Sequence, residues 1–214
     1  MKEKTLDQLK HLPYFTKNTL RSLSNESSNS LSVSIGRLLE KQKLVSLKNG
    51  YYVTKYFFEK NQHLVEYQEF LASVLCQPSY LSLEYVLSKY DLLPEGVLSF
   101  TSVTLKNTRS YENKLRSFNY KKLANRLFTG YQTEFFGQNE YLIASKAKAL
   151  FDYLYFAVKS TDLVNKNYDL VAEKRLRFEV LNKDDWQELN DYFNIGGSKM
   201  KQIKLNLSQH ASNH

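Results

Sequence analysis

The spacing of apolar residues predicts helices at the start of the chain, where these residues recur at helical intervals. A capping-box pattern at residues 5–8 opens a short helix, which Pro13 brings to an end. Thr16 is placed to cap a second helix, which directs Leu20 and Leu23 inward. We therefore expect two short helices before the first polar turn.

A third helix follows a turn rich in serine and asparagine. Its apolar residues Leu31, Ile35, Leu38 and Leu39 recur at i, i+4, i+7 and i+8, so they form one stripe along the helix. The opposite face consists of Ser30, Val33, Arg37 and Lys41, with Ser34 on its flank. Burial of the apolar stripe would leave this second face exposed.

A β-hairpin is predicted next, because β-prone segments at residues 44–47 and 51–53 flank a Lys-Asn-Gly turn at residues 48–50. Three helices and a hairpin, in this order, predict a winged helix-turn-helix at residues 1–58 that binds double-stranded DNA. The candidate DNA-binding residues are Ser30, Val33, Ser34 and Arg37 in the major groove, Lys41 on the same face, and Lys48 and Asn49 in the wing.

Charge supports this prediction, because most of the excess positive charge lies near the N-terminus. Residues 1–60 contain 11 basic and 5 acidic residues and carry +6 of the net charge of +8. The remainder has 19 basic and 17 acidic residues and is close to neutral. Basic side chains release counterions from phosphates, so a polyanionic partner is expected at the N-terminal end. A later cluster of Lys121, Lys122 and Arg126 is interpreted as a solvated surface, and contact with an acidic partner or nucleic acid is the alternative.

The pattern beyond the hairpin predicts a connecting helix at residues 59–78. Leu64, Tyr67 and Leu71 share one face of this helix, and Pro78 ends it. An apolar face of this length needs a partner, so the helix is expected to pack the first module against the rest of the chain.

Strand-like and helical patterns then alternate through a second domain at residues 79–206. The predicted elements are a helix at 79–90, strands at 97–104, 116–120, 126–136 and 140–143, a helix from Ser145, a strand at 175–181 and a helix at 184–193. The expected fold is α+β, an N-terminal winged helix-turn-helix followed by a mixed α/β C-terminal domain. Residues 207–214 are polar and are expected to form a disordered tail.

Composition narrows the possible chemistry. With 214 residues, 42% of them hydrophobic, the chain can bury a substantial core. It has no apolar run of about 18 residues and no apolar leader, so we expect a cytoplasmic protein without membrane contact. The single cysteine, Cys76, and the four scattered histidines form no metal-ligand pattern, and glycine-rich phosphate loops and serine nucleophile elbows are absent. We therefore expect no metal, no cofactor and no catalytic residue.

Two other function classes remain open. One is a nuclease, in which carboxylates gather around a metal, and the candidates are Glu134, Glu140, Asp152 and Asp169. Their spacing does not require such a site, and we interpret Asp152 as a structural residue bonded to neighbouring backbone. The other class is an adaptor whose winged helix binds protein, against which the basic residues of the candidate face argue.

The second domain contains five sequence blocks in a distinctive order. They are PSYLSLEYVL at 78–87, LPE at 93–95, SFTSVT at 99–104, FNY at 118–120 and IASKAKALFD at 143–152. Following a winged helix, these blocks resemble the AbiEi-type antitoxin family of bacterial type IV toxin-antitoxin systems, winged-helix regulators of viral defence. The resemblance covers roughly residues 5–160. It departs at Lys146 and Ala147, where relatives often have a Pro-Glu pair, and this change leaves the helix face intact.

The resemblance implies two activities. The N-terminal domain would bind operator repeats and repress its own operon, and residues 79–206 would form an antitoxin domain. That domain would counter a nucleotidyltransferase-like toxin encoded beside the gene. Direct contact between the two proteins is left open by the resemblance.

Overall fold

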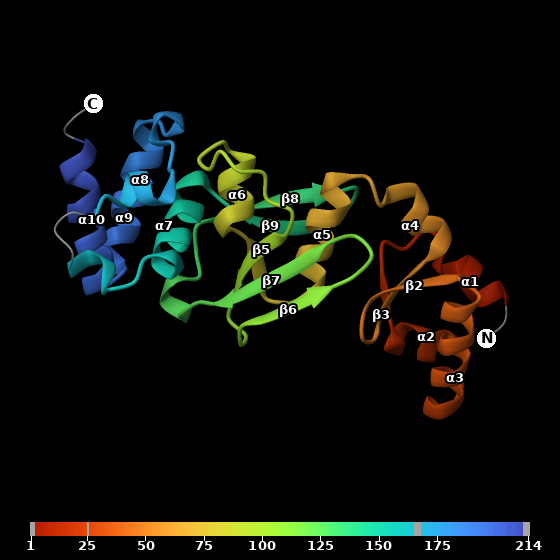
Figure 1. Ribbon diagram of the computed structural model, residues 1–214. Helices are drawn as coiled ribbons and strands as arrows, with labels where there is room; N and C mark the ends of the chain where they lie inside the picture. The colour runs from red at the N-terminus through yellow and green to blue at the C-terminus, as the bar shows by residue number, and fades with distance from the viewer. Residues whose placement is uncertain (1–2, 25, 165–167, 212–214) are drawn as a thin grey trace.

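A six-stranded mixed sheet occupies the middle of the molecule, with a small N-terminal module at one end and a group of helices at the other (Figure 1). The computed structural model describes residues 3–24, 26–164 and 168–211. Helices and strands occur in mixed order, which confirms the α+β class. The first and last helices, α1 (Glu3–Leu9) and α10 (Ser198–Ala211), lie at opposite ends of the molecule (Figure 1).

The N-terminal module comprises residues 3–61. After α1 its elements are β1 (Phe15–Thr16), α2 (Lys17–Ser24), α3 (Ser28–Glu40), β2 (Leu44–Lys48), β3 (Tyr51–Thr54) and α4 (Lys55–Asn61). The strands form an antiparallel sheet in the order β1-β3-β2, and Gly50 adopts a positive φ of 80° in the turn between β2 and β3. The three predicted helices and the Asn-Gly hairpin are therefore confirmed. The capping box expected at residues 5–8 is wrong, because α1 begins at Glu3 and Thr5 lies inside the helix.

A separate apolar core holds this module together. Leu31 and Ile35 of α3 are 0% and 4% exposed, which confirms the predicted stripe. The other buried members are Leu9, Phe15, Leu20, Leu44 and Tyr52. The prediction for Leu23 is wrong, because this side chain is 41% exposed and Leu20 is the buried residue of the short helix α2.

The segment predicted as one connecting helix forms two helices. α4 ends at Asn61 and α5 (Val65–Leu75) begins after an extended Leu64, whose ψ of 123° interrupts the helix. Leu64 is consequently 44% exposed instead of buried. Tyr67 and Leu71 are fully buried, as the pattern predicted. The helical spacing of Tyr67 and Leu71 was predicted correctly, but the break between α4 and α5 was not predicted.

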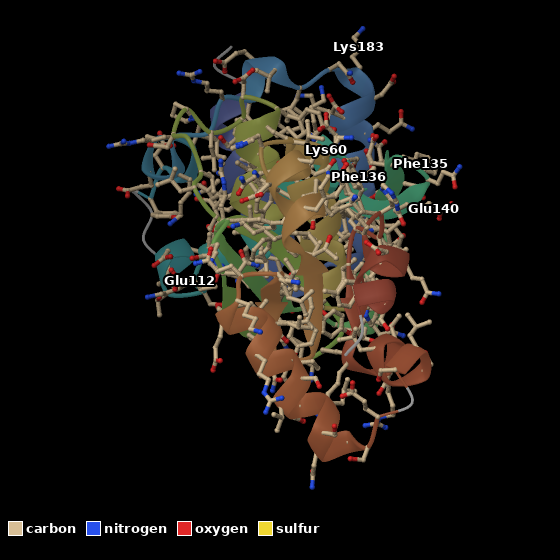
Figure 2. All side chains as sticks on the ribbon, turned by 90° about the vertical axis from the view of Figure 1, so that its right-hand side faces the viewer. Lys60, Glu112, Phe135, Phe136, Glu140 and Lys183 are labelled. Atoms are coloured by element: carbon tan, nitrogen blue, oxygen red, sulfur yellow. The ribbon has the colours of Figure 1, made fainter. Side chains whose placement is uncertain are left out.

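The central sheet has the order β6-β7-β5-β4-β9-β8. Its strands are β4 (Ser79–Leu81), β5 (Phe100–Thr104), β6 (Arg109–Glu112), β7 (Ser117–Lys122), β8 (Tyr131–Phe136) and β9 (Asn139–Ala144). β4 pairs antiparallel with β5 and parallel with β9, and β5 pairs parallel with β7. β6 and β8 are the two edges. Figure 2 shows Phe135 and Glu140 at one margin of the molecule and Glu112 at the other.

The structure of this region differs from the prediction at three places. The helix expected at 79–90, with its entry at Ser82, is present as α6 (Leu83–Lys89) with Ser82 at its N-cap position, but residues 79–81 form a strand that pairs with β5. The strand expected at 126–136 begins at Tyr131, after a 3₁₀ turn at Asn125–Leu127. The edge strand β6 was not predicted, because four residues of alternating exposure give too short a pattern.

Helices cover both faces of the sheet. α5 lies on one face, where the hydroxyls of Tyr120 and Tyr141 donate to the Ala72 carbonyl (2.6 Å) and the Glu69 carboxylate (2.7 Å). α7 (Lys146–Ala157) lies on the other face, where Tyr80 reaches Asp152. The side chain of Glu69 is 1% exposed and also accepts hydrogen bonds from Tyr85 and Lys89 of α6.

Two C-terminal helices, α9 (Lys183–Ile195) and α10, pack against α7. The short helix α8 (Leu170–Lys174) packs against α10. The helix predicted at 184–193 is confirmed as α9, and Asn182 and Asp185 form its capping box. The strand predicted at 175–181 is wrong, because its centre is a 3₁₀ turn at Phe178–Val180.

The disordered tail predicted at 207–214 is also wrong for the part that the structure describes. α10 continues to Ala211, and Leu207 is only 4% exposed because it packs in the main core. Residues 212–214 lie outside the described residues.

The N-terminal module is docked on the central sheet by specific contacts. Tyr67 of α5 donates to the Pro13 carbonyl at 2.8 Å, and Asn113 donates to the Leu47 carbonyl at 3.1 Å. Apolar residues of β2, β3 and α4 belong to the same core cluster as α5 and the sheet. α5 is therefore part of the sheet's core, and a fragment that begins at residue 79 would lack that layer.

A buried ionic network links the sheet to α7. Asp152 accepts hydrogen bonds from Tyr80 (2.9 Å), Ser82 (2.8 Å) and Lys148, and both charged side chains are 0% exposed. The predicted structural role of Asp152 is supported, but its partners are side chains and not neighbouring backbone. Burial lowers the pKa of Lys148 and raises that of Asp152, while their contact opposes both shifts.

We expect Asp152→Ala to lower the free energy of unfolding by about 3–5 kcal/mol, because it leaves the Lys148 ammonium without its counterion. Urea unfolding followed by circular dichroism measures this loss. Asp191→Ala, which removes an exposed carboxylate from α9, is the control and should change stability by no more than about 0.5 kcal/mol. Equal unfolding midpoints for the two variants would contradict the role of the network.

Candidate nucleic-acid interface

The outer face of α3 presents most of the residues predicted to bind DNA. Ser27 caps the helix by accepting from the Ser30 backbone N–H, which fixes where the helix begins. Val33 is 54% exposed, and Arg37 projects from the last turn. The exposed members of the predicted set are Ser30, Val33, Arg37, Lys41 and Asn49, and the partly buried members are Ser34 and Lys48. Ser30, Val33, Ser34 and Arg37 thus share α3, as predicted.

Glu26 modifies the chemistry of this face and was missed by sequence reasoning. Its carboxylate accepts hydrogen bonds from the hydroxyls of Ser34 (2.7 Å) and Ser30 (3.4 Å). The bond from Ser34 is the largest cause of the lowered pKa of Glu26, so the residue is negatively charged at neutral pH. The N-terminal part of the face therefore presents an acceptor, which suits a base amino group better than a phosphate.

Cations of α2 flank the same helix. Lys17 donates to Ser32 at 2.8 Å, and Arg21 lies 3.4 Å from the Ser28 hydroxyl. Both side chains lie next to α3 residues on the surface. The sequence pattern did not predict which residues of α2 lie beside which residues of α3. Positive charge thus lies beside the N-terminal half of α3 as well as at Arg37.

Lys48 departs from its predicted role in the wing. Its ammonium donates to the Leu75 carbonyl of α5 at 2.6 Å and lies 4.0 Å from the centre of the Tyr51 ring and 5.0 Å from that of Tyr111. These contacts connect β2 to the central sheet, so Lys48 docks the module. Asn49 remains exposed at the tip of the turn.

A second group of cations lies on the β6 side of the central sheet. We call Lys106, Arg109, Lys114 and Lys122 the basic edge. Residues 105–126 contain seven basic residues and one acidic residue, Glu112. Among the described residues, none of the four cations of the basic edge forms an ion pair. The net charge of residues 61–214 is close to zero, so it gives no sign of this surface. The excess of basic residues becomes visible only when charge is counted over a segment such as residues 105–126.

The basic edge lies close to the N-terminal module. Burial is the main cause of the lowered pKa of Lys48, and the charges of Lys106 and Arg109 lower it further. These two residues are therefore within electrostatic reach of Lys48. Lys114 shares a hollow with Lys55 of α4.

The cluster predicted from Lys121, Lys122 and Arg126 is divided. Successive residues of β7 point to opposite faces of the sheet. Lys121 accordingly lies 4.0 Å from Glu84 of α6, and Arg126 donates to the Ile195 carbonyl. Of these three residues, Lys122 belongs to the basic edge.

The carboxylates considered for a nuclease do not converge. Asp152 is enclosed by its network, and Asp169 caps α8 by accepting from the backbone of Val171 and Ala172. Glu134 and Glu140 lie opposite Tyr141 and Phe135 in the β8–β9 pairing, which places their side chains on different faces. Within the described ranges, no three acidic, histidine or cysteine side chains form a group suited to a metal ion.

Two further observations concern the chain as a whole. In the parts that the structure describes, no helix is both long enough and apolar enough to cross a membrane. Neither the models of known protein families nor the curated proteins contain a match to this sequence.

Proposed function

We propose that the chain is a DNA-binding transcriptional regulator whose N-terminal module acts as a winged helix. The observation that carries the proposal is the outer face of α3, which is exposed and flanked by cations of α2. The order of three helices and a β2–β3 hairpin supports the assignment of α3 as the recognition helix and the hairpin as the wing. Arg37, Val33 and the two serines would then enter the major groove.

The distribution of charge on this face suggests that some residues contact bases and others contact phosphates. Arg37 has the geometry for two hydrogen bonds to a guanine, while Lys17, Arg21 and Lys41 are suited to phosphates. Glu26 offers acceptor oxygens beside Ser30 and Ser34, so we infer that the N-terminal turn of α3 contacts base edges. Lys48 is left out of this set because its ammonium binds the carbonyl of Leu75.

The basic edge supports a DNA contact longer than the N-terminal module. Its side chains have no acidic partners among the described residues and begin next to the docked module. Figure 1 shows β6 on the side of the sheet toward which α2 and α3 also project. Phosphates that flank the recognised bases would therefore lie against Lys106, Arg109 and Lys122.

The resemblance to AbiEi-type antitoxins supports two further proposals. The regulator would repress its own operon, and the region after the N-terminal module would protect cells from a neighbouring nucleotidyltransferase-like toxin. The absence of a converging carboxylate group among the described residues favours this interpretation over the nuclease.

We expect Arg37→Ala to lose about 1–3 kcal/mol of binding free energy at one base position and to relax specificity there. Fluorescence anisotropy with duplexes from the promoter of the gene, each carrying one base change, measures this effect. Arg177→Ala removes an exposed arginine of the C-terminal region and serves as the matched control. Unchanged affinity and specificity in Arg37→Ala would remove α3 from the DNA interface.

The basic edge is tested by its dependence on salt. The variant Lys106→Gln/Arg109→Gln/Lys122→Gln should lower the slope of log affinity against log salt by about 2.7, because each lost phosphate contact contributes about 0.9. The control variant Lys174→Gln/Arg177→Gln/Lys201→Gln removes the same charge elsewhere and should leave the slope within about 0.5 of the original. Parallel slopes for the two variants would exclude the edge from the contact.

Protection from the toxin is expected to be independent of operator binding. The neighbouring toxin is co-expressed with the full chain or with Arg37→Ala, each from an unrelated promoter, and growth is recorded. Both proteins should restore growth relative to an empty vector, because neither relies on repression. Toxicity that persists with the full chain would refute the antitoxin proposal and leave the DNA-binding proposal untouched.

A further inference from the structure

β8 is an exposed edge strand that carries one charged side chain, Glu134, and lacks the other features that usually protect such edges. Its residues from Tyr131 to Phe135 are all exposed, and Phe135 retains 54% of its accessible surface. The strand contains no lysine and no proline, and its register with β9 continues without a bulge over six residue pairs. The opposite edge, β6, has four residues and carries the charge of Arg109.

The backbone of β8 directs alternate residues toward solvent. Phe136 and Asn139 close a two-residue turn, so the even-numbered residues of β8 exchange hydrogen bonds with β9. Leu142, opposite Thr133, donates its N–H to the Ser73 hydroxyl instead of to β8. The N–H and C=O groups of Tyr131, Thr133 and Phe135 therefore point away from the sheet.

The sequence of this edge is nearly symmetric about Thr133. Aromatic residues Tyr131 and Phe135 lie two positions to either side on one face of the sheet. Gln132 and Glu134 lie one position to either side on the other face. An antiparallel copy centred on Thr133 would place Tyr131 opposite Phe135, threonine opposite threonine, and the Gln132 amide opposite the Glu134 carboxylate.

Each of these cross-strand pairs is favourable. Aromatic pairs, threonine pairs and hydrogen-bonded polar pairs stabilise neighbouring antiparallel strands by about 0.2–1 kcal/mol each. The outward groups of the three odd-numbered residues would also form six backbone hydrogen bonds. A register centred on Glu134 is disfavoured because it places two carboxylates directly opposite each other, and one centred on Gln132 separates the aromatic residues.

We propose that β8 pairs with β8 of a second copy of this chain, antiparallel and across a two-fold axis at Thr133. The two central sheets would join into one continuous sheet of twelve strands. A symmetric pattern of aromatic, amide and carboxylate side chains is complementary to itself, and this selects a second copy over an unrelated strand. The proposal uses no residue of the DNA interface and stands independently of the proposed function.

Cysteine pairs test the register directly. Gln132 and the Glu134 of a second copy would form a non-hydrogen-bonded pair with Cα atoms about 4.5 Å apart, within the range of a disulfide. We expect a mixture of Gln132→Cys chains and Glu134→Cys chains to form a mixed disulfide on oxidation. Each variant alone should form none, because identical residues are offset by two positions. The native Cys76 is 3% exposed and contributes little background.

The assembly itself is measured by light scattering over a concentration series of the unmodified chain. The mass should rise toward twice the 25.1 kDa of one chain. Phe135→Lys removes both aromatic pairs and should weaken dimerisation about tenfold. Leu98→Lys replaces an apolar side chain that is 84% exposed outside the sheet and should change it less than about twofold.

Three results would overturn the proposal. The first is a constant monomer mass at every concentration. The second is a dimer that fails to form the mixed disulfide, which would place the interface elsewhere. The third is self-linking of Glu134→Cys or Gln132→Cys alone, which would contradict the register centred on Thr133. None of these results bears on operator binding or toxin protection.

Discussion

The buried carboxylate of Glu69 determines how the central layers are assembled. A charge that is 1% exposed is tolerated only when its hydrogen-bonding capacity is filled, and Tyr85, Lys89 and Tyr141 fill it. These three residues come from α6 and β9, so their bonds fix α5 against both the sheet and a neighbouring helix. Most of the other buried residues of α5 are apolar, and the buried carboxylate gives their packing a defined orientation.

The position of α5 in turn determines where the N-terminal module lies. Tyr67 of this helix binds the backbone of Pro13, and Lys48 of the hairpin binds the backbone of Leu75 at the end of the same helix. The contacts lie at both ends of α5, so they resist rotation of the module about its linker. These contacts consequently fix the position of the outer face of α3 relative to the basic edge.

The sequence pattern predicted correctly those helices and turns whose structure depends on residues close together in the chain. The stripe of Leu31 and Ile35 and the Asn-Gly hairpin were predicted because a helix period or a turn dipeptide is complete within a few residues. Leu23 and Leu64 were assigned wrongly because both lie where a helix ends, and the end of a helix is determined by packing against distant parts of the chain.

The errors at the candidate sites have the same physical origin. The partners of Asp152 are 70 or more residues away, apart from Lys148. Lys48, at the end of β2, binds a carbonyl 27 residues later. The spacing of residues along the chain cannot predict contacts between residues so far apart in sequence. The basic edge differs, because its charge was visible in the sequence and was hidden only by averaging over a nearly neutral domain.

Complete burial of Lys148 has a consequence for chemical labelling. Amine-acylating reagents need a solvent-exposed and uncharged amine, and this side chain is 0% exposed in the folded chain. Exposed lysines would react quickly, whereas Lys148 would react only during openings that separate α7 from the sheet. Mass spectrometry of the peptide that contains Lys148 measures its labelling rate. This rate therefore reports how often the central domain opens at α7.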